Sequence, residues 1–529
     1  MRKLKILYYN WVDFEDEQRR GGGVSIYQRN VIDAAVRNGD DVWYFSSGVC
    51  YSPFSRKPYV REVASKTQGV RKFEMVNSTI LSPGQEAFGQ DVARSPEMDP
   101  LFADFLRDYG PFDVIHFNNL EGIPLSFLRL AREHYPQTKI IYSVHNYFAF
   151  CPQVNLWFQE EATCRDFRAG RKCVNCLTHL LHPRGTQRQY RLEYLLAMLG
   201  ISPYSVTHRF ANWAIFGFLR SLYHVARSGY RWYKAGRQGK PDPSWGARRA
   251  TEATAILDPA AADRFVQRRR AFVDALNDYV DAVLPVSQRV ADLTVGFGID
   301  PAKVRTLYIG TRFAERATDA AATKPIVRGQ PLRLAYLGYM RRDKGFYFYL
   351  KALEKMPASL ARRLALTFAA KIVDPHACAQ IKRVAHRFAS VAFYDGYTHN
   401  QLPELLAGVD LAVVPVLWED NLPQVAIECV ASGVPILTSD RGGAQELLGC
   451  SDLVFRAGSR ADLYAKLRGV VADPSILASA IAGRSRLFSP HEHYELLREK
   501  FYLDAHGDAV RRQSETPSLE LQSAGTARL

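Results

Sequence analysis

The segment from residue 409 to residue 448 concentrates the side chains best suited to bind a polar ligand. It reads VDLAVVPVLWEDNLPQVAIECVASGVPILTSDRGGAQELL. Glu419, Asp420 and Glu428 supply carboxylates, which accept hydrogen bonds from hydroxyl groups and stabilise nearby positive charge. The same segment carries an amide and two glycines whose backbone N–H groups a diphosphate could approach, namely Asn421, Gly442 and Gly443.

Two short apolar runs are expected to position these side chains. Leu411–Pro415 and Val434–Thr438 have the composition of buried strands, and a helix that follows Pro423 and ends at Gly433 connects them. Strands that alternate with loops and helices predict a parallel, doubly wound sheet. Ligands bind beyond the carboxyl ends of such strands, which is where both polar loops fall.

A lysine next to a glycine follows another predicted strand. Leu332–Gly338 is the strand, and Lys344 with Gly345 stands at the start of a helix. A mobile cation beside the backbone donors of a helix N-terminus suits a diphosphate. Arg341 or Arg342 could reach the same phosphate.

A run of three glycines separates the first predicted strand from the first predicted helix. Gly22 and Gly23 lie between Leu4–Tyr9 and Val24–Arg37, so backbone N–H groups and the positive helix end meet there. This suits a phosphate or a sugar hydroxyl, although a plain flexible turn would use the same residues. The spacing is not G-x-G-x-x-G, which argues against a nicotinamide site.

The string WEDNLPQVAIECVASGVPILTSDRGGAQEL resembles the donor-sugar signature of glycosyltransferase family 4, whose members are retaining, depend on nucleotide sugars and have the GT-B fold. In that family two acids spaced E-x7-E flank the donor. Glu428 matches the second acid, which implies contact with ribose hydroxyls. The first acid would be Asp420, or Glu419 if the loop is one residue longer. The family's Gly-Arg…Lys-Gly pattern is matched by Gly338 and Lys344, with Tyr339 in place of the arginine.

The first half of the chain extends the resemblance. SVHNYFAFCPQ is similar to the family's H-[ND]-Y segment, which implies that His145 lies near the transferred sugar. The loop at Gly22 and Gly23 resembles the family's acceptor-side glycine loop. His116 ends another predicted strand, and a lone histidine in such a place is usually a packing residue.

Half of the eight cysteines fall within twenty-six residues. They are spaced C-x12-C-x8-C-x2-C, at Cys151, Cys164, Cys173 and Cys176. Reduced thiolates in such a cluster can hold a structural zinc ion, and buried thiols or a disulfide are the alternatives. No cofactor is expected for catalysis, because the chain contains no Asp-x-Asp triplet to bridge a metal to a diphosphate.

The chain is basic, with 69 Lys and Arg against 54 Asp and Glu and a net charge of +15. This favours an anionic partner. The stretch FANWAIFGFLRSLYHVARSGYRWYKAGRQGK mixes aromatic and basic residues, which suits a peripheral contact with an anionic membrane. A packed helical subdomain and a nucleic-acid surface are alternatives. No signal peptide and no transmembrane run are recognised, so we expect a cytoplasmic protein, with the inner membrane face as a possible docking place.

These observations predict an α/β protein with the GT-B fold, in which two Rossmann-like, doubly wound domains face a central cleft. The first domain would span residues 1–308 with a basic helical insertion at about 177–270. The second would span 309–485, followed by a helix at 486–505 that crosses back and a disordered tail at 506–529.

The expected activity is retaining transfer of a hexose from a nucleotide-diphosphate sugar to a lipid-linked or polysaccharide acceptor, without nucleic acid as a partner. A GT-B nucleotide-sugar epimerase or phosphorylase is an alternative. A basic, zinc-containing nucleic-acid-binding protein is a more distant one.

Overall fold

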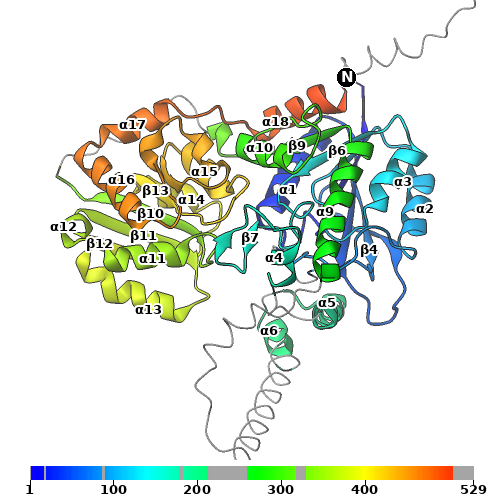
Figure 1. The fold of residues 1–529 in the computed structure, drawn as a ribbon, viewed down its shortest axis with the longest axis horizontal. Coiled ribbons are helices and arrows are strands. Elements are labelled where there is room, and N and C mark those ends of the chain that lie inside the picture. Colours follow the sequence, from blue (N-terminus) through cyan, green and yellow to red (C-terminus); the bar gives the residue numbers. More distant parts are fainter. Residues whose placement is uncertain are drawn as a thin grey trace, which may run out of the picture.

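The computed structural model describes residues 2–16, 20–85, 88, 90–177, 183–203, 205–212, 214, 259–316 and 329–503. These residues form two separate parallel sheets, each with helices on both faces, that lie side by side (Figure 1). The predicted fold class is confirmed.

The first sheet has the strand order β3-β4-β2-β1-β5-β6-β9. All its strand pairs are parallel except β3 with β4. Its strands are β1 (Lys5–Asn10), β2 (Asp41–Cys50), β3 (Tyr59–Val63), β4 (Val70–Val76), β5 (Val114–Phe117), β6 (Lys139–Val144) and β9 (Ala282–Pro285). The helices around it are α1 (Gly22–Arg37), α2 (Asp99–Tyr109), α3 (Ser126–His134), α9 (Pro259–Tyr279) and α10 (Gln288–Gly296).

The segment that follows α10 does not add a strand to the first sheet. Residues 303–308 make only an isolated bridge, between Val283 and Val304, and do not form a strand. The segment runs beside β9, where the N–H of Leu307 donates to the carbonyl of Pro285. Pro285 has no N–H to donate to the neighbouring segment, so the ladder of backbone hydrogen bonds between the two segments ends there.

The second sheet has the order β12-β11-β10-β13-β14-β15, and every pair is parallel. Its strands are β10 (Leu332–Tyr339), β11 (Leu364–Lys371), β12 (Ser390–Asp395), β13 (Leu411–Val414), β14 (Ile436–Ser439) and β15 (Val454–Phe455). Its helices are α11 (Phe346–Lys355), α12 (Ala358–Ala361), α13 (Pro375–Val384), α14 (Leu402–Ala407), α15 (Gln424–Ala431), α16 (Arg460–Ala472) and α17 (Ser475–Ala482). The strand order reverses between β10 and β13, and this switch point is where such sheets bind ligands.

A small hairpin stands between the two sheets (Figure 1). It consists of β7 (Trp157–Phe158) and β8 (Ala162–Thr163), which are antiparallel. The helices that follow are α4 (Arg171–Val174), α5 (Pro183–Met198) and α6 (Val206–Asn212). Most of the aromatic and basic stretch considered as a membrane contact lies outside the described residues. No helix of the described part has both the length and the apolar character needed to cross a membrane.

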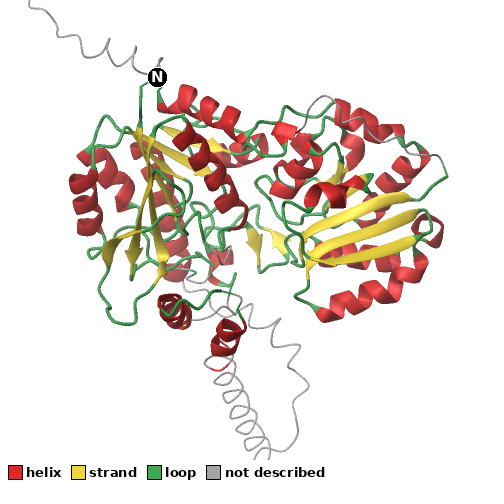
Figure 2. Cartoon of the chain, turned by 180° about the vertical axis from the view of Figure 1, so that it is seen from behind, coloured by secondary structure: helices red, strands yellow, loops and turns green. Residues whose placement is uncertain are grey.

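The last described helix, α18 (Pro490–Leu497), packs against α1 of the first domain, as the view from behind also shows (Figure 2). The hydroxyl of Tyr494 donates to Asp40 at 2.5 Å, and that of Tyr27 lies 3.1 Å from Nε2 of His493. Five residues in π-helical form, Arg498–Tyr502, continue it. The tail predicted at 506–529 lies outside the described residues.

Candidate functional site

An ion pair occupies the switch point between β10 and β13. Nζ of Lys344 lies 2.5 Å from Oδ2 of Asp420 and 5.2 Å from the centre of the Trp418 ring. Gly345 makes this approach possible, because it has a φ of +72° and a Cβ there would lie 1.7 Å from the carbonyl oxygen of Pro415. The loop after β13 and the start of α11 are therefore locked together, with a cation and a carboxylate at their junction.

Glu419 has a different role from the neighbouring Asp420. Its carboxylate accepts two bonds from the guanidinium of Arg289, at 2.8 and 3.0 Å, and a third from the N–H of Gly442 at 3.1 Å. Arg289 belongs to α10 of the first domain, so the buried Glu419 joins the two domains. This arrangement favours Asp420 as the first acid of the pair.

The loop after β14 packs directly on the loop after β13. Gly442 has a φ of +67°, and a Cβ there would lie 1.8 Å from the carbonyl oxygen of Asp420. The N–H of Gly443 donates to that same oxygen at 2.9 Å. The N–H groups of Gly442 and Gly443, which are expected to hold a diphosphate, both donate within the protein, so a diphosphate would have to replace these bonds.

Glu428 lies on α15, is 3% exposed, and meets a histidine that the sequence did not single out. Nε2 of His399 is 3.1 Å from Oε1 of Glu428. His399 stands in the loop between β12 and α14, and its side chain is 51% exposed. The segment that leads from β12 to β13 thus places the imidazole of His399 next to the carboxylate that is expected to bind ribose.

On the first-domain side, His145 directly follows β6. Its ring packs against that of Tyr27, with centroids 4.5 Å apart. Burial lowers the pKa of His145 to about 3, and His493 contributes to this shift. His145 is therefore neutral near pH 7. His116 is also buried, and its ring nitrogens lie 2.6 Å from the hydroxyl of Tyr502 and 2.8 Å from that of Ser143, which fits a structural role.

Several buried polar atoms near the domain interface have no hydrogen-bond partner within the described part of the chain. They are Nε2 of His145, the hydroxyl of Tyr147, Nε1 of Trp418, Oδ1 of Asn421 and Nε2 of Gln424. The two loops that carry most of them are in contact, since Nδ2 of Asn421 donates to the carbonyl of Val144, the residue before His145, at 3.1 Å. Buried polar groups are almost always paired, so this concentration indicates a place where a polar ligand binds.

The glycine run faces this interface. Gly22, with a φ of +53°, is the first residue of α1. A Cβ on Gly23 would lie 3.1 Å from Cγ of Gln424, the first residue of α15. The two helix N-termini therefore approach each other across the domains, and Gly23 permits the close contact.

The loop after β10 has two arginines with different surroundings. The guanidinium of Arg341, which is predicted to bind phosphate, donates two hydrogen bonds to Asp343, at 2.7 and 3.0 Å. This side chain is therefore already engaged within the protein. Arg342 makes no ion pair with any described residue. Gly338, at the strand end, has a φ of +131° that few other residues adopt.

A second carboxylate of the second domain completes the domain interface. Glu446 accepts bonds from the backbone N–H groups of Gln288 and Arg289, at 2.8 and 2.7 Å, and from the hydroxyl of Tyr308 at 2.7 Å. The hydroxyl of Ser287 donates to the carbonyl of Asn421 at 2.8 Å. Glu419 and Glu446 thus bind the N-terminal turn of α10 from two sides.

The cysteines of the predicted zinc site, Cys151, Cys164, Cys173 and Cys176, lie around the β7–β8 hairpin and α4. Burial, together with the neighbouring thiols, raises the pKa of Cys173 and Cys176 to about 12. In the described chain no three His, Cys, Asp or Glu side chains form a group that could hold a metal ion. The zinc site stays a prediction.

Comparisons with known proteins agree with this geometry. Residues 331–473 match the family model of glycosyl transferases group 1. A glycogen synthase of Mycobacterium tuberculosis is 30% identical over 172 residues, which cover 32% of this chain and 41% of that enzyme. Spore coat protein SA of Bacillus subtilis is 23% identical over 187 residues, covering 32% of this chain and 49% of that protein. The alignments thus span less than half the length of these relatives.

Solved structures extend the likeness to nearly the whole chain. A sucrose-phosphate synthase from Thermosynechococcus elongatus has a TM-score of 0.50 at 15% identity, and covers 97% of this chain and 99% of its own. A glycosyltransferase from Rickettsia africae also has a TM-score of 0.50, at 12% identity, and covers 96% of this chain and 100% of its own. The chain therefore has the fold of GT-B glycosyltransferases, and its second domain matches the model of glycosyl transferases group 1 over residues 331–473.

Proposed function

We propose that this protein is a glycosyltransferase that moves a hexose, with retention at the anomeric carbon, from a nucleotide-diphosphate sugar to a lipid-linked or polysaccharide acceptor. The observation that carries the proposal is the set of unpaired buried polar atoms around the Lys344–Asp420 pair. A ligand rich in hydroxyl groups and carrying phosphate is the chemistry that satisfies such a set. The match to glycosyl transferases group 1 covers the domain that would hold the donor.

Each group has a part in the proposed reaction. The bond between the anomeric carbon and the diphosphate breaks as an acceptor hydroxyl oxygen bonds to that carbon, and the hydroxyl proton leaves with the diphosphate. Lys344 stabilises the negative charge that develops on the diphosphate. Asp420, which the incoming phosphate would replace at Lys344, is then available to the donor sugar. Glu428 accepts hydrogen bonds from ribose, and neutral His145 bonds a hydroxyl of the transferred sugar.

The proposed acceptor and the proposed membrane contact are supported by two further observations. A glycogen synthase among the similar proteins favours a saccharide acceptor. The net charge of +15 favours an anionic surface as a docking place. An epimerase or phosphorylase would be indicated instead if the nucleotide sugar were consumed in the absence of any acceptor.

The test is a thermal-shift panel of UDP-, GDP- and ADP-sugars on the wild type, Lys344→Ala and the control Lys351→Ala. Lys351 is exposed on α11 and away from the ion pair. A ligand that binds the native state raises its melting temperature by mass action. We expect one nucleotide to stabilise the wild type and the control, and Lys344→Ala to lose the shift. No shift with any sugar nucleotide at millimolar concentration would contradict the proposal.

We also propose that the four clustered cysteines bind a structural zinc ion. Arg268 and Arg269 of α9 lie near the thiols, and burial lowers the pKa of Arg268 to about 10 while Cys151 acts to raise it. Two half-buried guanidinium groups beside the thiols would balance the charge of four thiolates around one Zn²⁺. Elemental analysis of the purified protein tests this, because a chain without bound zinc would leave the thiols as packing residues.

A further inference from the structure

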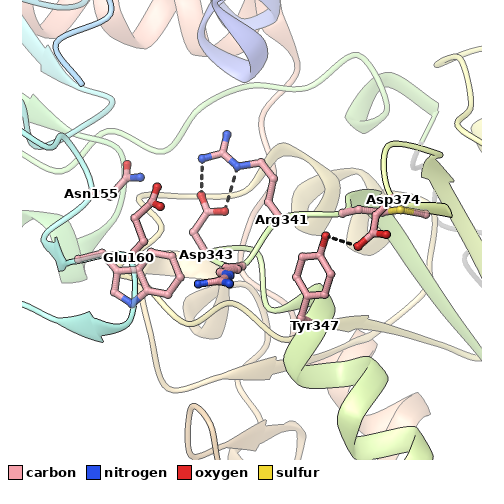
Figure 3. A pocket seen from close by; sticks show the side chains of 9 residues that line it. Asn155, Glu160, Arg341, Asp343, Tyr347 and Asp374 are labelled. Carbon is pink, nitrogen blue, oxygen red and sulfur yellow. Dashed lines mark hydrogen bonds and ion pairs between the residues drawn. The ribbon is translucent and has the colours of Figure 1, made fainter. Parts of the chain in front are cut away.

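A cavity of about 530 Å³ lies between the two domains next to the candidate donor site (Figure 3). The β7–β8 hairpin supplies Asn155 and Glu160 on one side. The loop after β10, α11 and the start of α13 supply Arg342, Tyr347 and Asp374 on the other. The cavity has the size of a small-molecule site and is built from both domains. Neither acid of the E-x7-E-like pair lines it, nor does Lys344.

The cavity contains polar groups without partners. Asn155 is 8% exposed, and its side-chain amide makes no hydrogen bond to any residue that the structure describes. Figure 3 shows this side chain on the hairpin side of the cavity. Arg342 has no ion pair with a described residue either. The amide lines the cavity, so a ligand hydroxyl can form a hydrogen bond with it.

The charged side chains that line the cavity indicate which class of ligand it can bind. Three carboxylates line the cavity, and only two guanidinium groups do. Arg341 is held by Asp343 at 2.7 and 3.0 Å, and the hydroxyl of Tyr347 donates to Asp374 at 3.0 Å (Figure 3). Because Asp343 neutralises Arg341, only one of the two guanidinium groups is left to face an anion, which disfavours a phosphate or a second nucleotide. A ligand with many hydroxyl groups can donate to the carboxylates and accept from Arg342 and Asn155.

The cavity and the ribose carboxylate lie on different faces of the second sheet. α11 connects β10 to β11, whereas α15 connects β13 to β14 in the opposite direction along the sheet. Right-handed crossovers place two such helices on opposite faces. Tyr347 of α11 and Glu428 of α15 therefore lie on opposite faces of the sheet, and the Lys344–Asp420 pair lies in the loops that precede these two helices.

We propose that this cavity binds an uncharged pyranose unit of the acceptor, so that the acceptor is a neutral glycan. The inference rests on the proposed glycosyl transfer. Arg342 and Asn155 bond the ring hydroxyls, and Glu160, Tyr347 and Asp374 accept or donate at the remaining ones. Trp157 of β7 adds an aromatic side chain to the lining, a group on which the apolar face of a sugar ring can pack.

The experiment is binding of the full chain to an array of immobilised glycans in the presence of the nucleoside diphosphate that stabilises it. The array holds uncharged, amino-bearing, uronic-acid-bearing and phosphorylated oligosaccharides. The variants are Arg342→Ala and Tyr347→Phe, and the matched control is Arg383→Ala, an exposed arginine on α13 outside the cavity.

We expect binding to a subset of the uncharged glycans. Arg342→Ala should weaken it about tenfold, because a hydrogen bond from a charged donor is lost, and Tyr347→Phe about threefold. Arg383→Ala should stay within twofold. The proposal is overturned if only acidic or amino-bearing glycans bind, if none binds, or if Arg342→Ala weakens the nucleoside diphosphate but not the glycan. A wild type that no nucleotide sugar stabilises would instead overturn the proposed function itself.

Discussion

The two halves of the candidate site hold their polar groups in opposite ways. In the second domain the charged side chains are paired in advance, Lys344 with Asp420 and Glu428 with His399. In the first domain His145 and Tyr147 are uncharged, and Nε2 of the former and the hydroxyl of the latter are buried with no hydrogen-bond partner among the described residues. A nucleotide sugar that binds the second domain must replace these existing ion pairs. In the first domain, by contrast, the buried polar atoms are available to form hydrogen bonds with sugar hydroxyl groups.

The largest expected effect comes from the charged half. Lys344→Ala removes the cation and leaves the 5% exposed Asp420 to repel the incoming phosphate. We expect the affinity for the nucleoside diphosphate to fall about 100-fold, which corresponds to the loss of strong charge-assisted bonds. Calorimetric titration measures this, with Lys351→Ala as the control. A fall of less than about threefold would show that the second domain does not hold the diphosphate through this lysine.

Glu428→Gln keeps the shape of the side chain and removes its charge. We expect the affinity for the matching nucleoside monophosphate to drop about tenfold, because the ribose hydroxyls lose a charged acceptor. A double-mutant cycle with His399→Gln measures how strongly the two side chains are coupled. Equal binding by the variant and the wild type would remove Glu428 from the donor site.

The domain interface gives a stability test of the same comparison. Arg289→Met removes the two closest donors of the carboxylate of Glu419, 3% exposed, and leaves it the N–H of Gly442 and, at 3.8 Å, the guanidinium of Arg441. We expect the free energy of unfolding to fall by about 1–3 kcal/mol. Arg107→Met, which breaks the exposed pair with Asp104, is the matched control and should cost well under 1 kcal/mol. Urea denaturation compares the two variants. Equal losses of unfolding free energy would mean that the interface pair stabilises the protein no more than the exposed pair does.

At neutral pH the smallest effect concerns the neutral half, because it develops only as the pH falls. The pKa of His145 is lowered to about 3, so between pH 6.5 and pH 3 the unfolded chain binds a proton that the native protein does not. Stability therefore rises with pH across this window and is lost as the pH falls. Each such histidine contributes a slope of at most about 1.4 kcal/mol per pH unit.

The variant His145→Gln should flatten this slope, measured by urea denaturation between pH 4 and pH 6.5. His134→Gln, at an exposed histidine of α3, serves as the control and should leave the slope in place. An unchanged slope in His145→Gln would show that this imidazole is not held neutral by burial.

The sequence located the second half of the site better than the first. Buried strands such as β13 and β14 are short apolar runs, and the loops after them are polar, so Asp420 and Glu428 could be placed at a sheet edge. The partners could not, because Arg289 precedes Glu419 by 130 positions and His399 precedes Glu428 by 29. Only the folded chain shows that Glu419 is engaged and that the amides of Gly442 and Gly443 are used internally.

Elements of the first domain were missed for a similar reason. β3 and β4 read YVREV and VRKFEMV, where charged residues interrupt the apolar pattern. They lie at the sheet edge, where Arg61 and Glu74 form an ion pair across the two strands. Single-chain periodicity does not show such cross-strand pairing, because it depends on which strands become neighbours.

The contacts of Glu419 and Glu446 with the start of α10 limit how freely the two domains can be recombined. A chimaera that replaces residues 331–473 with the corresponding domain of another enzyme would separate both carboxylates from Ser287, Gln288 and Arg289. A designer who wants to change donor preference by exchanging domains would therefore have to transplant that tripeptide as well, or accept a loosely joined hybrid.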